Sequence, residues 1–238
     1  MVLLLSVLFE CECLVAIIQN LPRAVIFDLD GTLMDTSGEI ASAMARTFAS
    51  LGLRPLEKGE VEAMIGKGVR VLVERALAKA DASHLDTDAT TVMFEMHYEA
   101  TLGTDSPLYP GVTEGLERLC AAGVPMGVVT NKPRFFTDRL LEQAGVTRYL
   151  SAVVAGDDGH AKKPAPDMLL AACSTLATAP AATLMLGDSE NDVAAARAAG
   201  CRVWCVPYGY NEGRPAESLA CDRLVPDIGA AVELLLHR

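Results

Sequence analysis

The sequence predicts an α/β protein built on a doubly wound parallel sheet, with a block of helices inserted after the first strand. Three observations lead to this prediction. From residue 112 onward, short apolar runs alternate with segments of helical periodicity, which is typical of a parallel sheet covered by helices on both faces. Residues 37–102 show the helical pattern alone. Polar residues follow each of the first four predicted strands.

The expected strands are short apolar runs, and the expected helices carry apolar residues at spacings of three and four. The strands are predicted at 24–27, 126–130, 150–155, 183–186 and 202–207. Four helices of the insertion are predicted at 39–51, 58–65, 69–80 and 88–102, and five further helices at 112–122, 134–144, 167–176, 191–199 and 228–236. The chain of 238 residues therefore suits one domain with an insertion.

The expected division of the chain follows from these elements. Residues 23–36 and 107–238 are expected to form the α/β core, and residues 37–106 the helical insertion. Residues 1–22 are interpreted as an extension ahead of the domain. Glu10 and Glu12 interrupt its apolar runs, which argues against a membrane span, and no Lys or Arg precedes the first run, which argues against a secretory signal. A targeting role is the alternative.

Charge and cysteine usage limit the class of partner and the compartment. The net charge is −11, so non-specific binding to nucleic acid is not expected. An anionic ligand would have to be attracted by a metal ion or by a few placed cations. The seven cysteines include no CxxC pair, and we interpret them as free thiols of a cytoplasmic protein. No stable insertion into a membrane is expected, and the sequence predicts no particular oligomeric state.

Polar residues at the strand ends are expected to form one site, because ligands of open α/β sheets bind outside the carboxyl ends of the strands. The first strand is followed by Asp28 and Asp30, and the second by residues 130–132. The third leads through 156–158 to 162–164, and the fourth is followed by 187–192.

These residue types fit phosphoryl transfer from a small phosphorylated metabolite. Asp28 can attack phosphorus and form an aspartyl-phosphate. Asp30, on the same side if the strand geometry continues, can protonate the leaving oxygen and later deprotonate the attacking water. Converging carboxylates call for a hard cation such as Mg²⁺, and Asp188 would complete its coordination. Thr130 can donate a hydrogen bond to the phosphoryl group, and Lys163 can neutralise its developing charge.

Each motif alone has a simpler interpretation. The run 28–32 could be a turn or part of a calcium loop, although Leu33 occupies the position where such a loop needs glycine. Residues 187–189 could only cap the following helix. The ordered set of four, each after a predicted strand, favours an assembled site.

The four motifs resemble those of the haloacid dehalogenase-like (HAD) superfamily of hydrolases. The matching runs are 28–33, 129–131, 163–164 and 187–192. The resemblance implies a Rossmann-like core with a small α-helical cap. It also implies Mg²⁺ held by the Asp28 side chain, the backbone carbonyl of Asp30 and the Asp188 side chain. Asp192 would be an outer or water-mediated ligand.

Further runs resemble the bacterial phosphoglycolate phosphatases of this superfamily, notably 65–68, 109–112, 130–133 and 208–211. This resemblance implies hydrolysis of 2-phosphoglycolate, with another phosphatase activity, on a sugar phosphate or pyrophosphate, as the alternative. A phosphomutase, a dehalogenase and a non-catalytic binding module are less favoured. Besides Thr130 and Lys163, the residues expected to bind substrate are Asn131, Gly66 and Lys67.

The cap region 66–70 is expected to read the substrate carboxylate, because its glycines let backbone N–H groups approach a ligand at the start of a helix. In the alternative interpretation, Gly66 and Gly68 only shape a turn between helices.

Overall fold

The computed structural model describes residues 21–236. The predicted extension, residues 1–22, therefore falls almost entirely outside the described residues. In the part that is described, no helix combines the length and the apolar character needed to cross a bilayer.

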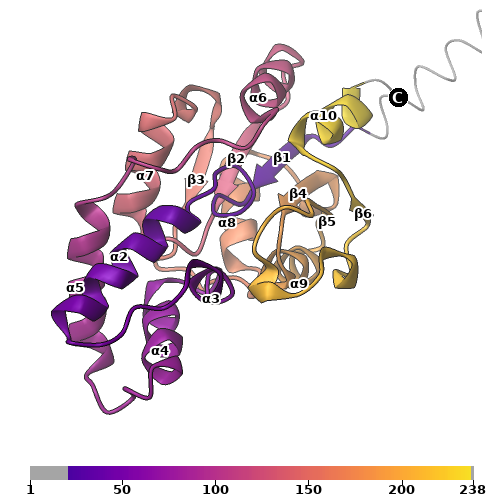
Figure 1. Ribbon diagram of the computed structural model, residues 1–238. Coiled ribbons are helices and arrows are strands. Elements are labelled where there is room, and N and C mark those ends of the chain that lie inside the picture. Colours follow the sequence, from indigo (N-terminus) through magenta and orange to yellow (C-terminus); the bar gives the residue numbers. More distant parts are fainter. Residues whose placement is uncertain (1–20, 237–238) are drawn as a thin grey trace, which may run out of the picture.

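A six-stranded parallel sheet forms the centre of the described chain (Figure 1). Its strands are β1 (Ala24–Phe27), β2 (Met126–Val129), β3 (Ala152–Val154), β4 (Thr183–Gly187), β5 (Arg202–Cys205) and β6 (Arg223–Leu224). The order across the sheet is β3-β2-β1-β4-β5-β6. The central strand β1 is buried on both faces, which explains its uninterrupted apolar sequence. The predicted α/β fold is confirmed.

Helices cover both faces of the sheet. They are α6 (Val112–Ala121), α7 (Arg134–Gln143), α8 (Asp167–Thr175), α9 (Glu190–Ala199) and α10 (Ile228–Leu236). Val25 and Phe27 pack in one hydrophobic cluster with α6, α7 and α10. Ala24 and Ile26 pack in a second cluster with α8 and α9. The alternation of side chains along a strand thus divides the core into two layers of packing.

The helices that follow β1 have a hydrophobic cluster of their own. They are α2 (Ser37–Ser50), α3 (Lys58–Glu62), α4 (Val69–Lys79) and α5 (Thr87–Glu99), grouped beside the sheet in Figure 1. Met44, Phe48, Val73 and Phe94 are buried in this cluster, and Phe136 of α7 joins it from the sheet side. The inserted helices are therefore packed mainly on one another.

The boundaries of several elements differ from the prediction. The helix expected at 58–65 ends at Glu62, and the following residues form tight turns that lead to Gly66. The strand β6 was not predicted, because two residues carry no periodic pattern. Helix α5 begins at Thr87 because the Asp86 carboxylate accepts hydrogen bonds from the N–H groups of residues 88 and 89.

The strand order places a topological switch point between β1 and β4. From β1 the chain passes outward to β2 and β3, and it then returns to add β4 on the other side of β1. A crevice at the carboxyl ends of such a pair is where open α/β sheets bind ligands. Asp28 follows β1 and Asp188 follows β4, so the two aspartates flank this point.

Candidate active site

Asp28 lies buried at the carboxyl end of the central strand. Its N–H donates to the Leu186 carbonyl oxygen at 2.9 Å and so continues the pairing with β4. The carboxylate oxygen Oδ1 accepts hydrogen bonds from the Leu29 N–H at 2.7 Å and from Lys163 Nζ at 2.8 Å. The side chain also lines a pocket, and Oδ2 has no donor among the described residues. One carboxylate oxygen of Asp28 is therefore held by two donors, and the residue lies in the wall of the pocket.

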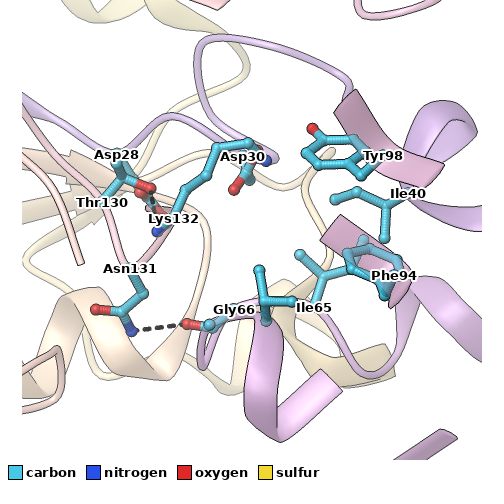
Figure 2. Close-up of a pocket in the computed structure, with 12 residues that line it drawn as sticks. Asp28, Asp30, Ile40, Ile65, Gly66, Phe94, Tyr98, Thr130, Asn131 and Lys132 are labelled. Carbon is cyan, nitrogen blue, oxygen red and sulfur yellow. Dashed lines mark hydrogen bonds and ion pairs between the residues drawn. The ribbon is translucent and has the colours of Figure 1, made fainter. Parts of the chain in front are cut away.

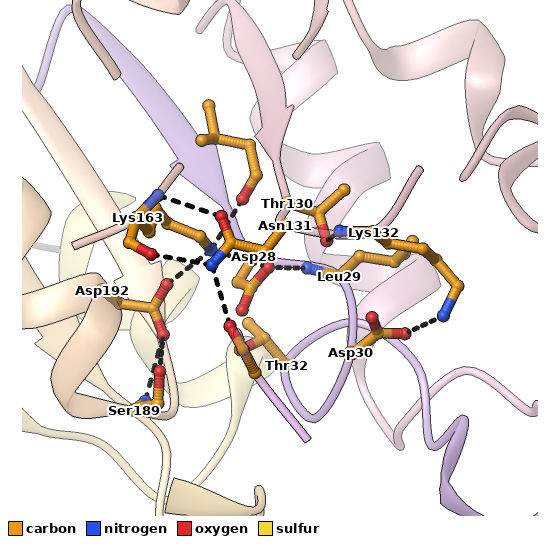
Figure 3. Close-up of polar contacts among 12 residues, drawn as sticks. Asp28, Leu29, Asp30, Thr32, Thr130, Asn131, Lys132, Lys163, Ser189 and Asp192 are labelled. Carbon is orange, nitrogen blue, oxygen red and sulfur yellow. Dashed lines mark hydrogen bonds and ion pairs between the residues drawn. The ribbon is translucent and has the colours of Figure 1, made fainter. Parts of the chain in front are cut away.

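Lys163 holds two carboxylates together. Its Nζ lies 2.7 Å from Asp192 Oδ1 and 2.8 Å from Asp28 Oδ1, and it also donates to the Val129 carbonyl oxygen at 2.9 Å (Figure 3). These acceptors use all three protons of the ammonium group. Burial lowers the pKa of Lys163, but the charges of Asp192 and Asp28 raise that pKa above its usual range, so the side chain stays charged.

Asp188 is held by groups from two loops. Thr32 Oγ1 donates to its Oδ1 at 3.0 Å, and the Tyr210 N–H donates to its Oδ2 at 2.7 Å. Gly31 has a φ of +82°, and a Cβ there would lie 2.6 Å from Asp188 Oδ2. Only glycine therefore allows this turn to approach the carboxylate without displacement.

The capping interpretation of residues 187–189 is correct for Ser189 but not for Asp188. Ser189 is the N-cap of α9 and forms a capping box with Asp192, whose Oδ2 accepts from Ser189 Oγ at 2.7 Å. Asp188 makes no cap of the helix and faces Asp28 instead. One short run thus starts a helix and supplies a carboxylate to the site.

Three carboxylates converge in this crevice, with their oxygens within 4.8 Å of one another: Asp28, Asp188 and Asp192. Burial raises the pKa of Asp28 well above its ordinary value; Lys163 opposes this effect, whereas Asp192 and Asp188 add to it. Burial, followed by the charge of Asp192, raises the pKa of Asp188 to about 7. A divalent cation with oxygen ligands would relieve this crowding. Since Asp192 is engaged by Lys163 and Ser189, Asp28 and Asp188 are the side chains best able to hold it.

Asp30 does not join the carboxylate cluster. The strand ends at Phe27, so the strand alternation from which we predicted its direction does not continue. Its Oδ1 accepts from Thr36 Oγ1 at 2.7 Å and from Lys132 Nζ at 2.8 Å. It nevertheless lines the same pocket as Asp28. This position suits a proton donor better than a metal-binding carboxylate.

Thr130 and Asn131 both line the pocket, but their side chains are used differently. Thr130 Oγ1 accepts from the Lys132 N–H at 3.2 Å and retains its own proton for a ligand. The Asn131 amide is occupied by backbone groups: its Nδ2 donates to the carbonyl oxygens of Gly66 and Lys163, and its Oδ1 accepts from the Lys163 N–H at 2.9 Å. Asn131 therefore joins three segments of the site.

Of the two predicted residues between α3 and α4, only Gly66 lines the pocket. The Lys67 ammonium lies 3.2 Å from Glu212 Oε1 and is 37% exposed. It is not among the residues that line the pocket. The structure thus brings Asp28, Asp188, Lys163 and Thr130 together and leaves Lys67 at the rim, in an ion pair.

The pocket itself lies between the strand ends and the inserted helices. Figure 2 shows Asp28, Thr130 and Asn131 on one side and Ile40, Phe94 and Tyr98 on the other. Its volume is about 40 Å³. The site is therefore small, polar on the sheet side and largely apolar on the helix side.

Three residues of the site had no assigned role in the sequence. Lys132 and Tyr98 line the pocket. Lys132 is the third polar residue after β2, and this position at a strand end is the one feature of the sequence that indicates a role in the site. Tyr98 lies at a helical spacing that predicts a residue of the hydrophobic core. The Tyr210 hydroxyl donates to Asp35 Oδ1 at 2.9 Å and accepts from the N–H groups at the start of α2, a long-range contact that no local pattern indicates.

Comparison with known proteins extends this description. Residues 25–206 match the model of the haloacid dehalogenase-like hydrolase family. A phosphoglycolate phosphatase of Nitrosospira multiformis is 44% identical over 216 residues, which cover 90% of this chain and 95% of that protein.

Two solved structures share the fold. The crystal structure of a predicted phosphoglycolate phosphatase from Haemophilus somnus has a TM-score of 0.85 and 31% identity, with 89% of this chain and 97% of that chain covered. CbbY from Rhodobacter sphaeroides, in complex with xylulose-(1,5)bisphosphate, has a TM-score of 0.75 and 26% identity, with 87% and 95% covered. With its ordered motifs, its crevice of carboxylates and these relatives, the chain belongs to the haloacid dehalogenase-like hydrolases.

Proposed function

We propose that this chain is a phosphoglycolate phosphatase, which hydrolyses 2-phosphoglycolate to glycolate and phosphate. The observation that carries the proposal is the position of Asp28: buried at the switch point, held through Oδ1 by Lys163, and part of the lining of a small pocket. The relative from Nitrosospira multiformis, similar over nearly its whole length, supports this choice of substrate.

The proposed chemistry has two steps. Asp28 Oδ2 attacks phosphorus, the bond from phosphorus to the glycolate oxygen breaks, and Asp30 gives a proton to that oxygen. Water then attacks the aspartyl-phosphate, Asp30 takes its proton, and phosphate leaves while the Asp28 carboxylate is restored. Thr130 binds a phosphoryl oxygen, and Lys163 keeps Asp28 in place and balances charge.

We infer that Mg²⁺ is the cofactor. Asp28 and Asp188 would hold it through their side chains and Asp30 through its backbone carbonyl. The donor set fits, because these are oxygen ligands that converge in one crevice, and burial together with the neighbouring carboxylates raises the pKa of both Asp28 and Asp188. A bound Mg²⁺ would neutralise the carboxylates and stabilise the negative charge of the phosphoryl group in transfer.

We also propose that residues 37–106 act as a cap over the core of residues 23–36 and 107–238. The separate hydrophobic cluster of α2–α5 supports this division. Ile40, Ile65, Phe94 and Tyr98 would then close the pocket over the substrate and exclude water.

The enzyme is proposed to work in the cytoplasm on a small phosphorylated metabolite. The cysteines at 120, 173, 201, 205 and 221 carry free thiols, which suits a reducing compartment. The charge of −11 makes nucleic acid a poor partner.

Phosphate release from a panel of substrates tests the proposal. The panel contains 2-phosphoglycolate, a hexose phosphate, xylulose-1,5-bisphosphate and pyrophosphate, each assayed with Mg²⁺. We expect the highest kcat/KM for 2-phosphoglycolate, by about tenfold or more. A preference for a sugar phosphate would favour the alternative, which the likeness to CbbY supports. No release from any member would contradict the proposed activity.

A further inference from the structure

We propose that Lys132 and Tyr98 together bind the carboxylate of the substrate. This inference rests on the proposed function and names the residues that read the acid end of 2-phosphoglycolate. It assigns that role to the wall of the pocket rather than to the cap region 66–70, where the sequence had suggested it.

Lys132 is a buried cation that can donate further hydrogen bonds. Its side chain is 4% exposed and lines the pocket. An ammonium group has three protons; the Lys132 Nζ donates one to Asp30 Oδ1 at 2.8 Å and lies beside the Tyr98 hydroxyl, which leaves at least one proton for a ligand. Burying an ammonium with unused donors is unfavourable unless a ligand or water accepts from them. An anionic group in the pocket would do so.

Tyr98 supplies a second donor from the helix side of the pocket. Its hydroxyl is buried and has no hydrogen-bond partner among the described residues. Lys132 Nζ lies 4.9 Å from the centre of the Tyr98 ring, and its charge acts on the pKa of the Tyr98 hydroxyl, so the two polar groups are neighbours. Burial raises the pKa of Tyr98 to about 12, which keeps the hydroxyl protonated and able to donate at neutral pH. A neutral donor beside a cation binds a carboxylate without adding a second charge to desolvate.

Four other residues of the lining are apolar. Ile40, Ile65, Val69 and Phe94 are apolar and cannot solvate an anion. Lys67, the cation first expected to read the substrate, is paired with Glu212 outside the lining. The phosphoryl group is assigned to the Asp28 side of the pocket, and Figure 2 shows Tyr98 across the cavity from it.

The test compares a substrate with its uncharged analogue. For each variant, kcat/KM is measured for 2-phosphoglycolate and for 2-hydroxyethyl phosphate, in which a CH₂OH group replaces the carboxylate. The ratio of the two values reports recognition of the carboxylate alone. We expect Tyr98→Phe to lower this ratio by about tenfold or more, mainly through KM, because a hydrogen bond to a charged group is lost. The matched control is Tyr149→Phe, whose hydroxyl accepts from Arg148 and donates to Glu117 at the exposed surface.

Lys132→Met and Lys132→Arg separate recognition from positioning. Lys132 also contacts Asp30, so Lys132→Met should lower kcat for both substrates, but it should lower the ratio still further than Tyr98→Phe. Lys132→Arg keeps the charge and should recover part of the ratio. Equal losses on both substrates, with the ratio unchanged in Tyr98→Phe and in Lys132→Met, would overturn the inference and leave Lys132 as a positioning residue for Asp30.

The wild-type ratio distinguishes this failure from failure of the proposed function. If the wild type prefers 2-phosphoglycolate and the variants keep that preference, only the inference is wrong. If the wild type shows no preference for the carboxylate, both are wrong. Melting temperatures identify a variant that does not fold, and in that case Tyr98→Phe, which removes a single unpartnered oxygen, decides the question.

Discussion

At the scale of single residues, the site is a set of buried carboxylates whose negative charges are compensated in part by Lys163. Lys163 compensates Asp28 and Asp192, whereas the donors to Asp188 among residues 21–236 are the Thr32 hydroxyl and the Tyr210 N–H. Burial, followed by the charge of Asp192, raises the pKa of Asp188 to about 7. Proton uptake by Asp188 and metal binding at the site should therefore compete.

The metal-free protein should lose stability as pH rises toward 7. The folded pKa of Asp188, about 7, exceeds its ordinary value of 3.8. The folded state thus favours the protonated carboxyl, and this contribution to stability is complete below the unfolded pKa and lost as pH rises through about 7. Melting temperatures in EDTA between pH 5 and pH 8 should fall less in Asp188→Asn than in the wild type. The same pH dependence in both proteins would show that Asp188 does not carry the effect.

Asp30→Asn should separate acid–base chemistry from metal binding. The variant keeps the backbone carbonyl assigned to the metal but cannot transfer the proton, so kcat for 2-phosphoglycolate should fall by about 10²- to 10⁴-fold. Mg²⁺ affinity, measured by calorimetry, should change little. The loss should be smaller for p-nitrophenyl phosphate, whose leaving group needs less protonation. An equal loss on both substrates would argue against Asp30 as the acid.

At the scale of elements, the site depends on loops that approach one another closely. The turn after β1 passes beside Asp188 at Gly31, and the loop after β5 donates its Tyr210 N–H to the same carboxylate. These loops come from opposite ends of the chain. The strands therefore contribute to the site by fixing where the loops at their carboxyl ends begin.

Gly31→Ala should damage the site beyond its backbone strain. Both Gly31 and Gly52 have positive φ, at +82° and +69°, but a Cβ at Gly52 meets nothing within 4 Å. Each substitution should cost about 1 kcal/mol of unfolding free energy through its backbone conformation. Only Gly31→Ala should also lower Mg²⁺ affinity and kcat, because its Cβ displaces Asp188. Unchanged activity in Gly31→Ala would mean that the turn yields without moving the carboxylate.

The sequence predicted most of the sheet and the residues at its strand ends, because apolar runs and strand-end polarity are local signals. Asp28, Thr130, Lys163 and Asp188 could be placed in this way. The position of Lys67 could not, because it depends on Glu212 from a distant loop. The role of Tyr98 could not be predicted either, because an aromatic residue at helical spacing indicates a core position. The unpartnered hydroxyl becomes visible only in the assembled pocket.

At the scale of the whole molecule, the sheet with its covering helices and the helices α2–α5 meet at the pocket. The sheet and its helices supply the charged groups, and α2–α5 supply the apolar wall. Direct links join them: the Asn131 amide donates to the Gly66 carbonyl oxygen at 2.8 Å, and Arg75 pairs with Glu212 at 2.8 Å. The pocket thus combines anion binding with exclusion of water.

Removal of the metal should inactivate the molecule without unfolding it. The three hydrophobic clusters contain no part of the carboxylate crevice, so EDTA should abolish turnover while the circular dichroism spectrum is retained. Added Mg²⁺ should restore activity and raise the melting temperature. Full activity in EDTA would rule out the metal assignment.

The central claim is that Asp28 carries the phosphoryl group during turnover. It is tested most directly by acid-quenching the enzyme within milliseconds of mixing with 2-phosphoglycolate and then locating the label by peptide mass spectrometry. We predict phosphate on the peptide that contains Asp28, and none on the corresponding peptide of Asp28→Asn, which should also lack turnover. Label on another residue, or turnover by Asp28→Asn near the wild-type rate, would contradict the account.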